Sequence, residues 1–263
     1  MTNWRIHHKA ETASTNLDAR TGRHGDVFTA DYQTAGRGRL DHKWLSPPGA
    51  NLMMSVVLSI DGLAPEQVAT LPLVVGLAVI KVVGSDVLGR PQPPENENSV
   101  LCRLRAARRS APTVQLKWPN DVLVDGRKIA GILCERNGDN VIAGIGVNVR
   151  QTEFPPEIAT RATSLQIVCG APGGRALPSS DTVRDQILSQ LDKWCGIWRS
   201  AGFAAVYPEI AAVDFMRGRE IAVRQADDDP APVIGVSNGI MPDGSLDVGG
   251  TKVYAGEAHV ERI

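Results

Sequence analysis

The sequence predicts an α+β fold: a mixed or antiparallel sheet with flanking helices, followed by a small all-β unit. Short apolar runs of strand length, separated by Asp-Gly and Asn-Gly-Asp turns, fill residues 114–149, and similar runs return from about residue 215. Longer stretches at 65–89 and 181–200 have the length of helices. With 263 residues, 43% of them hydrophobic, the chain can bury a sizeable core.

The N-terminal part is expected to alternate strands with one short helix. The runs WRIHHKAE (4–11) and VFTADYQ (27–33) are typical of short strands. Between them, STNLDARTG (14–22) begins with residues that cap helices, which predicts a short helix. The apolar run ANLMMSVVLSI (50–60) has the length of a buried strand.

Two helices are predicted further along. The stretch 65–89 opens with a proline and ends with a glycine, and its pattern is broken near Pro72. It is expected to be a mostly buried helix. The stretch 181–200 has an acidic start, and its apolar residues recur at helical spacing, so its tryptophans are expected in the core.

Two boundaries divide the chain. Residues 90–112 are rich in Pro, Asn and Glu and then in Arg, which predicts an insertion or a long surface loop. From 213 to 263 the pattern changes to short strands and turns, among them PDGS at 242–245. We therefore predict a catalytic-type domain over 1–212 and a small β-barrel over 213–263.

Composition excludes several classes of protein. A net charge of −1 argues against a surface devoted to nucleic acid, although the RLRAARR run at 103–109 could bind an acidic partner. We find no run of about 18 apolar residues, so no membrane span is expected. The four cysteines form no CxxC pair, which predicts free thiols, no zinc site and a cytoplasmic protein.

The stretch GRGRLDHKW (36–44) places two arginines between glycines and ends on Trp44. The guanidinium groups of Arg37 and Arg39 suit bidentate binding of phosphate, and the adjacent glycines let the backbone come close to a ligand. We interpret the stretch as a polyphosphate-binding loop whose indole stacks on a nucleobase. The alternative is a turn whose arginines pair with distant carboxylates.

The stretch KWPNDVLVDGRKIAGIL (117–133) predicts a turn followed by a hairpin. Lys128 leaves this hairpin beside small residues and could act as a fixed cation between a carboxylate substrate and a phosphate. Asp121 could help bind magnesium or orient a base. A plain hairpin with an exposed lysine would have the same pattern.

Two further groups of polar residues could bind a small ligand. Asn148, in GIGVNV, is flanked by apolar strand residues and needs a partner, either an adenine edge or the protein backbone. Ser14, Thr15 and Asn16 could cap the short helix or, together with Gln33, hydrogen-bond a polar head group.

Together these stretches resemble the biotin protein ligases. The motifs occur in the family's order: STN, then QTAGRGR with a tryptophan five residues later, KWPND, RKIAGIL and GIGVNV. The resemblance implies the catalytic fold that this family shares with class II aminoacyl-tRNA synthetases, and a C-terminal SH3-like barrel. It covers nearly the whole chain except the 90–112 insertion and the weakly patterned region 150–178.

The resemblance also implies an activity and its residues. Biotin and ATP, with Mg²⁺ held mainly by the ATP phosphates, would form biotinyl-5′-AMP, and biotin would pass to a lysine of a biotin carboxyl carrier domain. The catalytic residues would be Lys128, Arg39 and Asp121. The residues that bind biotin would be Ser14, Thr15, Asn16, Gln33, Gly36, Arg37, Gly38, Arg39, Lys128, Gly131 and Gly144. The residues that bind ATP and the adenylate would be Arg37, Arg39, Trp44, Lys117, Asn120, Lys128 and Asn148.

Several alternatives stay open at this point. A lipoate–protein ligase would share the fold, and an octanoyl transferase would need a cysteine nucleophile such as Cys134. A non-catalytic module could bind the adenylate or the acceptor domain. Because the STN turn comes by residue 14, no N-terminal DNA-binding domain and no repressor role are expected. The family includes monomers and dimers, so a homodimer is left open.

Overall fold

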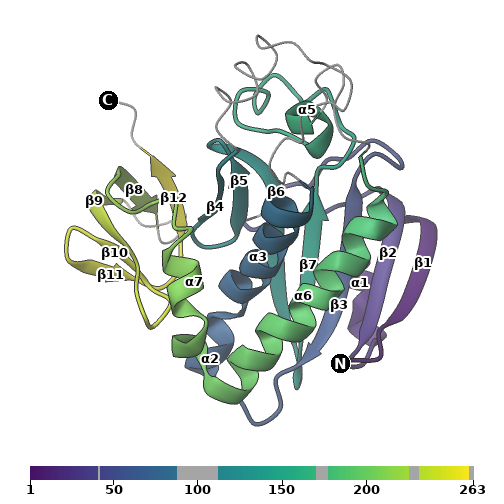
Figure 1. Cartoon of the computed structure of the whole chain (residues 1–263), viewed down its shortest axis with the longest axis horizontal. Coiled ribbons are helices and arrows are strands. Elements are labelled where there is room, and N and C mark those ends of the chain that lie inside the picture. The colour runs from purple at the N-terminus through teal and green to yellow at the C-terminus, as the bar shows by residue number, and fades with distance from the viewer. Residues whose placement is uncertain (41, 88–111, 170–176, 225–230, 261–263) are drawn as a thin grey trace, which may run out of the picture.

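The computed structural model describes residues 1–40, 42–87, 112–169, 177–224 and 231–260. A large sheet lies behind two helices, α3 and α6, and a smaller sheet stands beside it, formed by the C-terminal part of the chain (Figure 1). This is the mixed α+β arrangement that the sequence predicts.

Within the described residues the large sheet has seven strands, in the order β1-β2-β3-β7-β6-β5-β4. The strands are β1 (Arg5–Thr12), β2 (Asp26–Gln33), β3 (Leu52–Ser59), β4 (Val114–Lys117), β5 (Asp121–Val124), β6 (Arg127–Asn137) and β7 (Asn140–Val147). All neighbours pair antiparallel except β1 and β2, which are parallel. Side chains of β3 are buried at nearly every position, whereas those of the edge strand β1 are mostly exposed.

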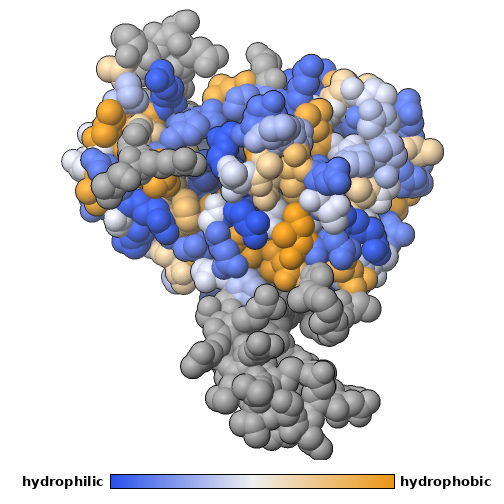
Figure 2. Space-filling model, turned by 90° about the horizontal axis from the view of Figure 1, so that it is seen from above, coloured by the Kyte–Doolittle hydropathy of each residue, from blue (hydrophilic) through white to orange (hydrophobic). Residues whose placement is uncertain are grey.

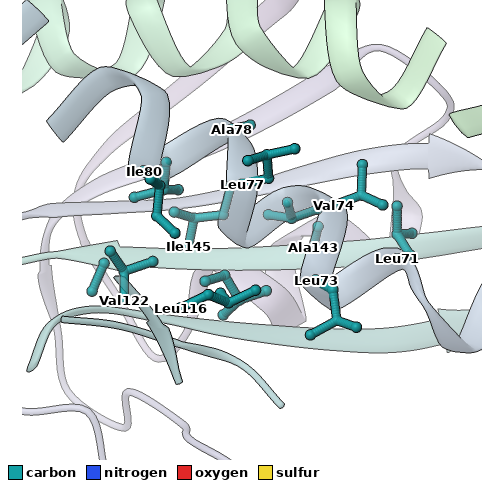
Figure 3. Close-up of a cluster of buried hydrophobic side chains, with 14 of the residues drawn as sticks. Leu71, Leu73, Val74, Leu77, Ala78, Ile80, Leu116, Val122, Ala143 and Ile145 are labelled. Carbon is teal, nitrogen blue, oxygen red and sulfur yellow. The ribbon is translucent and has the colours of Figure 1, made fainter. Parts of the chain in front are cut away.

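Helices cover one face of this sheet. The predicted helix at 65–89 is divided into α2 (Pro65–Ala69), α3 (Leu71–Lys81) and a π-helical turn η2 (Val82–Val87). The division lies at Thr70, because Pro72 lacks a backbone N–H and belongs in the first turn of a helix. Side chains of α3 interdigitate with those of the sheet beneath it (Figure 3).

Helix α3 also explains the most apolar part of the sequence. Among the described residues, one helical stretch, Pro65–Gly84, has the length and hydropathy to cross a membrane. It is 67% buried inside the protein, between the sheet and α6 (Ser180–Ala201), which is the environment of a core helix.

The face drawn in Figure 2 is largely hydrophilic, with hydrophobic residues in small separate areas.

Helix α6 covers the range predicted for it, 181–200, and extends it by one residue at each end. Ser179 Oγ accepts a hydrogen bond from the backbone N–H of Thr182, and Gly202 ends the helix with φ of 77°. Trp194 and Trp198 are buried, as expected of core residues. The sequence analysis missed α5 (Leu165–Cys169) and α7 (Tyr207–Ala211), each of five residues and too short for a periodic pattern.

The short helix predicted at 14–22 is present as α1 (Thr15–Asp18) and a 3₁₀ turn, η1 (Ala19–Thr21). A second 3₁₀ turn, η3 (Phe203–Ala205), follows α6. The arginine-rich insertion predicted at 90–112 lies, apart from its last residue, outside the described residues.

The C-terminal residues form an antiparallel sheet of five strands in the described part of the chain, in the order β11-β10-β9-β8-β12. These are β8 (Glu220–Arg224), β9 (Val233–Ile240), β10 (Leu246–Val248), β11 (Thr251–Val253) and β12 (Glu257–Val260). Asp214 joins this sheet to the rest: its carboxylate accepts hydrogen bonds from the backbone N–H groups of Met216 and Ile240, both at 2.8 Å. Burial raises the pKa of Asp214, and these hydrogen bonds partly offset that effect.

Candidate active site

A cavity of about 120 Å³ lies at the centre of the large sheet, where the start of α1 and the end of β2 meet β3, β6 and β7. The loop 36–44 borders it on one side, and the turn between β4 and β5 and the strand β12 border it on another. All but two of the residues predicted for the site line it. They are Ser14, Thr15, Asn16, Gln33, Arg37, Gly38, Arg39, Trp44, Lys117, Asn120, Asp121, Lys128, Gly131 and Gly144.

One end of the cavity is a buried network of small polar side chains. Gln33 Oε1 accepts hydrogen bonds from the backbone N–H and the hydroxyl of Thr15, at 2.8 and 3.1 Å. Ser55 Oγ lies 2.7 Å from Thr15 Oγ1 and donates to Asn16 Oδ1 at 2.6 Å. Ser14 is the N-cap of α1, but its side chain makes no capping hydrogen bond. Ser14 therefore lines the cavity without capping the helix.

Glycines let this network and the loop approach the sheet. A Cβ atom on Gly144 would overlap the side-chain amide of Asn16. A Cβ atom on Gly146 would lie 2.5 Å from Cε2 of Trp44, and one on Gly131 would lie 3.3 Å from Cζ3 of the same indole. Strands β6 and β7 thus leave room for the amide at one end of the cavity and for the indole at the other.

The loop 36–44 folds back on itself beside the cavity. Trp44 donates its backbone N–H to the carbonyl of Gly36 at 2.9 Å, and Gly38 donates to the carbonyl of His42 at 2.6 Å. Gly36 lines a neighbouring cavity instead of this one. A side chain on Gly36 would collide with the backbone carbonyl of Trp44, so its glycine is required by the packing of the loop.

The two loop arginines face carboxylates from distant parts of the chain. Arg37 Nη1 donates to Glu135 Oε1 at 3.1 Å. Burial lowers the pKa of the Arg39 guanidinium, and the charges of Asp121 and Glu257 partly offset this. The arginines therefore have distant carboxylate partners in this structure, as the alternative interpretation of the loop expects, and both arginines also line the cavity.

A group of cations lies at the other end of the cavity. Lys128 Nζ is 2.6 Å from Asp121 Oδ1 and 5.9 Å from the centre of the Trp44 ring. Burial lowers the pKa of Lys117, Asp121 raises it, and the nearby charge of Lys128 lowers it further. Lys117, Lys128 and Arg39 together outnumber their two acidic neighbours, Asp121 and Glu257. The net positive charge of this group suits phosphate oxygens.

The backbone of this cation group is held by neighbouring segments. Asn120 Nδ2 donates to the carbonyl of Ile132 at 2.7 Å, which fixes the turn between β4 and β5. The backbone N–H of Lys128 donates to the carbonyl of Arg161 at 2.7 Å, and its carbonyl accepts from Thr163 at 2.8 Å. Segment 161–163 thus runs beside Lys128 as a short parallel bridge.

Asn148 does not line the cavity. It is buried, and its Nδ2 donates to the backbone carbonyl of Thr163 at 3.0 Å. Of the two partners considered for Asn148, the structure shows the backbone, through the same segment that flanks Lys128.

Sequence reasoning missed three polar residues at the site. Ser55 lies in the apolar run of β3, Glu135 lies just beyond the RKIAGIL motif, and Glu257 reaches the cavity from the C-terminal sheet. A serine inside a fully buried strand is a signal that could have been used, because a buried hydroxyl needs a partner. Nothing in the sequence identifies Glu257.

Two other kinds of catalytic group are a nucleophilic cysteine and a bound metal ion. Burial raises the pKa of the Cys134 thiol, so this cysteine is not activated as a nucleophile. Within the described residues, no three His, Cys, Asp or Glu side chains gather to hold a metal ion. What the cavity offers is a small polar pocket joined to a cation group under a glycine-rich loop.

Comparison with known proteins decides the family. Residues 5–151 match the family model described as the biotin/lipoate A/B protein ligase family. The chain belongs to this family.

One member of the family covers nearly the whole chain. A biotin–[acetyl-CoA-carboxylase] ligase of Mycobacterium tuberculosis is 32% identical over 97% of this chain and 87% of its own length. The bifunctional ligase/repressor BirA of Bacillus subtilis is 33% identical over 58% of this chain, which spans only 42% of that protein.

A solved structure has the same fold. The biotin protein ligase from Aquifex aeolicus in complex with biotin and ATP superposes with a TM-score of 0.77. It is 26% identical, and the match covers 98% of this chain and 99% of the other.

Proposed function

We propose that this chain is an ATP-dependent biotin–protein ligase. The observation that carries the proposal is one cavity with a hydrogen-bonding pocket at one end and Arg39, Lys117 and Lys128 at the other. The pocket fits a polar head group, and the cations fit the phosphates of a nucleotide. The relatives named as biotin ligases and the neighbour solved with biotin and ATP support this assignment.

In the first step a carboxylate oxygen of biotin attacks the α-phosphorus of ATP. A new P–O bond forms to the carboxylate, and the bond between the α-phosphorus and the bridging oxygen breaks, so that pyrophosphate leaves. Negative charge grows on the phosphoryl oxygens during this step. Arg39, Lys117 and Lys128 would stabilise that charge from the border of the cavity. The loop 36–44 would shield the labile mixed anhydride from water.

In the second step the neutral amine of an acceptor lysine attacks the acyl carbon of biotinyl-5′-AMP. The C–N bond forms, the bond from the acyl carbon to the phosphate oxygen breaks, and AMP leaves. As the C–N bond forms, the nitrogen releases a proton to the solvent. Asp121, which lies beside Lys128, would orient the incoming amine. The acceptor would be a carboxyl carrier domain of a biotin-dependent carboxylase.

Magnesium would arrive on the phosphates of ATP. The phosphate oxygens of the nucleotide are the kind of ligand that Mg²⁺ prefers, so they would coordinate most of the ion. Of the two carboxylates that line the cavity, Asp121 and Glu257, we assign the contact with this ion to Asp121. The ion would neutralise phosphate charge when bound.

We infer further details that rest on the family resemblance. Residues 1–212 would be the catalytic domain, and the five-stranded C-terminal sheet within 213–263 would be an SH3-like barrel. The site would include Gly36 as a loop residue and Asn148 as an adenine contact. A cytoplasmic location is part of this proposal, and the free thiols of Cys134 and Cys195 are in keeping with it. A homodimer and the lack of nucleic-acid binding stay proposals.

The test is ATP–pyrophosphate exchange with biotin, lipoate or octanoate supplied singly. We expect exchange with biotin alone in the wild-type protein, and a loss of about 100-fold or more in Lys128→Ala, because a transition-state cation is removed. Lys193→Ala, an exposed lysine on α6, is the matched control and is expected to behave as wild type.

Other outcomes would change the assignment. Exchange that requires lipoate would make the chain a lipoate–protein ligase. A folded protein that exchanges with none of the three acids would be a non-catalytic module.

A further inference from the structure

Glu135, near the end of β6, makes contacts that the reaction just described does not use. It lies outside the lining of the cavity, and its side chain is 24% exposed. Its two carboxylate oxygens have different partners. Oε1 accepts from Nη1 of Arg37, on the loop, and Oε2 accepts from Nδ2 of Asn16, in the polar pocket, at 2.6 Å.

The contact with Asn16 fixes which way its amide points. An ionised carboxylate can only accept hydrogen bonds, so the NH₂ group of the amide must face Glu135. The amide oxygen then faces Ser55, whose hydroxyl donates to it at 2.6 Å. Both ends of the amide are therefore assigned by their neighbours, and a flipped amide would lose both hydrogen bonds.

This orientation gives the pocket an acceptor for ligand N–H groups. An amide oxygen can accept two hydrogen bonds, and Ser55 uses one of them. The free position of Asn16 Oδ1 suits a head group with N–H donors, such as a cyclic urea. A dithiolane or a plain alkyl chain has no N–H to offer.

The contact with Arg37 ties the loop to the same carboxylate. The side chain of Arg37 is 45% exposed and that of Glu135 is 24% exposed, so the ion pair is partly shielded from solvent. A hydrogen-bonded path thus runs from the loop through Glu135 and Asn16 to Ser55, over contacts of 3.1, 2.6 and 2.6 Å.

We propose that Glu135 is a positioning residue that couples head-group recognition to the placement of Arg37 on the loop. It orients the Asn16 amide toward a urea-type head group and, with its other oxygen, holds Arg37 over the same ligand. This inference rests on the proposed function and adds a specificity-determining residue to it.

Glu135→Gln is the sharpest test because it keeps the size of the side chain and one acceptor oxygen. The glutamine can accept a hydrogen bond from Asn16 or from Arg37 but not from both, because its NH₂ group cannot accept a hydrogen bond. We expect the Kd for biotin, measured by calorimetry, to rise about tenfold, the equivalent of about 1.4 kcal/mol. We expect biotinyl-5′-AMP to dissociate about tenfold faster in a chase experiment. The kcat for exchange at saturating biotin should stay close to wild type, because no reacting atom loses a contact.

Arg37→Gln and the double variant separate coupling from simple loss of a contact. If Arg37 and Glu135 act as a pair, the adenylate should leave the double variant no faster than the worse single variant. Because Arg37 is an exposed loop residue, its substitution keeps the test available if Glu135→Gln does not fold. Glu66→Gln, on exposed α2, is the matched control.

Three results would overturn the inference. The first is a biotin affinity and a rate of adenylate release equal to wild type in both single variants. The second is a purely additive effect of the two substitutions in the double variant. The third is an equal fall in kcat and kcat/KM together with a lowered melting temperature. A wild-type protein that binds no biotin would instead remove the proposed function, and this inference with it.

Discussion

Trp118 Nε1 donates a hydrogen bond to the backbone carbonyl of Gly244 at 3.2 Å. The tryptophan belongs to the KWPND turn beside the cation group, and the glycine belongs to the turn between β9 and β10. This contact connects the C-terminal sheet to the turn that carries Lys117 and Asp121. Glu257, on the same sheet, reaches the cavity itself.

Trp118→Phe is predicted to weaken this connection. The ring would keep most of its packing but lose the hydrogen bond, and the carbonyl of Gly244 would lose its partner. We expect the free energy of unfolding to fall by about 1–2 kcal/mol and the KM for ATP to rise. Chemical denaturation and exchange kinetics would measure the two effects.

Trp198→Phe is the control for that experiment. Trp198 donates to Thr70 Oγ1 at 2.9 Å within the helical layer, away from the cavity. A comparable loss of stability with an unchanged KM for ATP is expected. If the KM changes equally in both variants, the contact with Gly244 does not support the site.

Alanine at two neighbouring glycines of β7 should affect different substrates. In Gly144→Ala the new Cβ would displace the Asn16 amide, so the KM for biotin should rise at least about tenfold. In Gly146→Ala the new Cβ would push against Trp44, so the KM for ATP should rise more than that for biotin. Exchange assays that vary one substrate at a time would separate the two.

Gly196→Ala, in the interior of α6, is the control for the glycine substitutions. Apart from its chain neighbours and the backbone of its own helix, no atom of the described residues lies within 4 Å of the Cβ that alanine would add there. We expect unchanged kinetics and a stability equal to wild type or up to about 1 kcal/mol higher. A large kinetic effect at Gly196 would mean that glycine replacement itself, and not the local contact, alters the enzyme.

Asp121→Asn should change how exchange depends on alkaline pH. Burial lowers the pKa of Lys117, and the charge of Asp121 raises it. Without that charge, Lys117 loses its proton at lower pH, so phosphate binding should weaken earlier as pH rises. The alkaline limb of kcat/KM for ATP should therefore move to lower pH. Asp125→Asn, in the next turn of the hairpin, should leave the limb unmoved.

Asp26 should make the fold sensitive to acid. Burial alone would raise the pKa of Asp26, but hydrogen bonds from the backbone N–H of Arg23 and the side chains of His7 and Arg5 hold it well below its usual range. A pKa lowered in the folded state stabilises the protein above the unfolded value, and that stability is lost as pH falls toward the folded value.

The Asp26→Asn variant measures this contribution. At pH 7 we expect it to be less stable than wild type by about 1–2 kcal/mol. The difference should shrink steadily below about pH 5, as the wild-type carboxylate gains its proton. Urea denaturation at pH 7 and pH 3.5 would measure it, and a difference that does not depend on pH would contradict the assignment.

Local sequence patterns predicted most of the secondary structure but little of its pairing. The apolar runs and turns of 114–149 predicted strands joined by hairpins, and consecutive hairpins pair antiparallel with few alternatives, as the structure shows for β4 to β7. The parallel pairing of β1 with β2 could not be read in the same way. It depends on where α1 returns the chain to the sheet, and this is a property of the packed structure.

In the site, too, residues that lie in short motifs could be predicted, whereas their partners from distant parts of the chain could not. Residues within short motifs, such as Asn16, Arg39 and Lys128, could be placed from sequence and meet in one cavity. The partners that orient them could not: Glu135 lies 98 positions from Arg37 and 119 from Asn16. A single glutamate at the end of a strand has no distinguishing pattern until the fold brings it to the loop.

The short bridge between Lys128 and segment 161–163 bears on how one lysine could serve two successive reactions. Both backbone hydrogen-bonding groups of Lys128 are occupied, so its Cα is held in place, while its side chain is 38% exposed. Only the side-chain torsions are left to vary. An ammonium on a fixed stem can follow the negative charge from the phosphoryl oxygens of the first transition state to the departing AMP of the second. Under the proposed function, the same lysine would then act in both reactions without a rearrangement of the sheet.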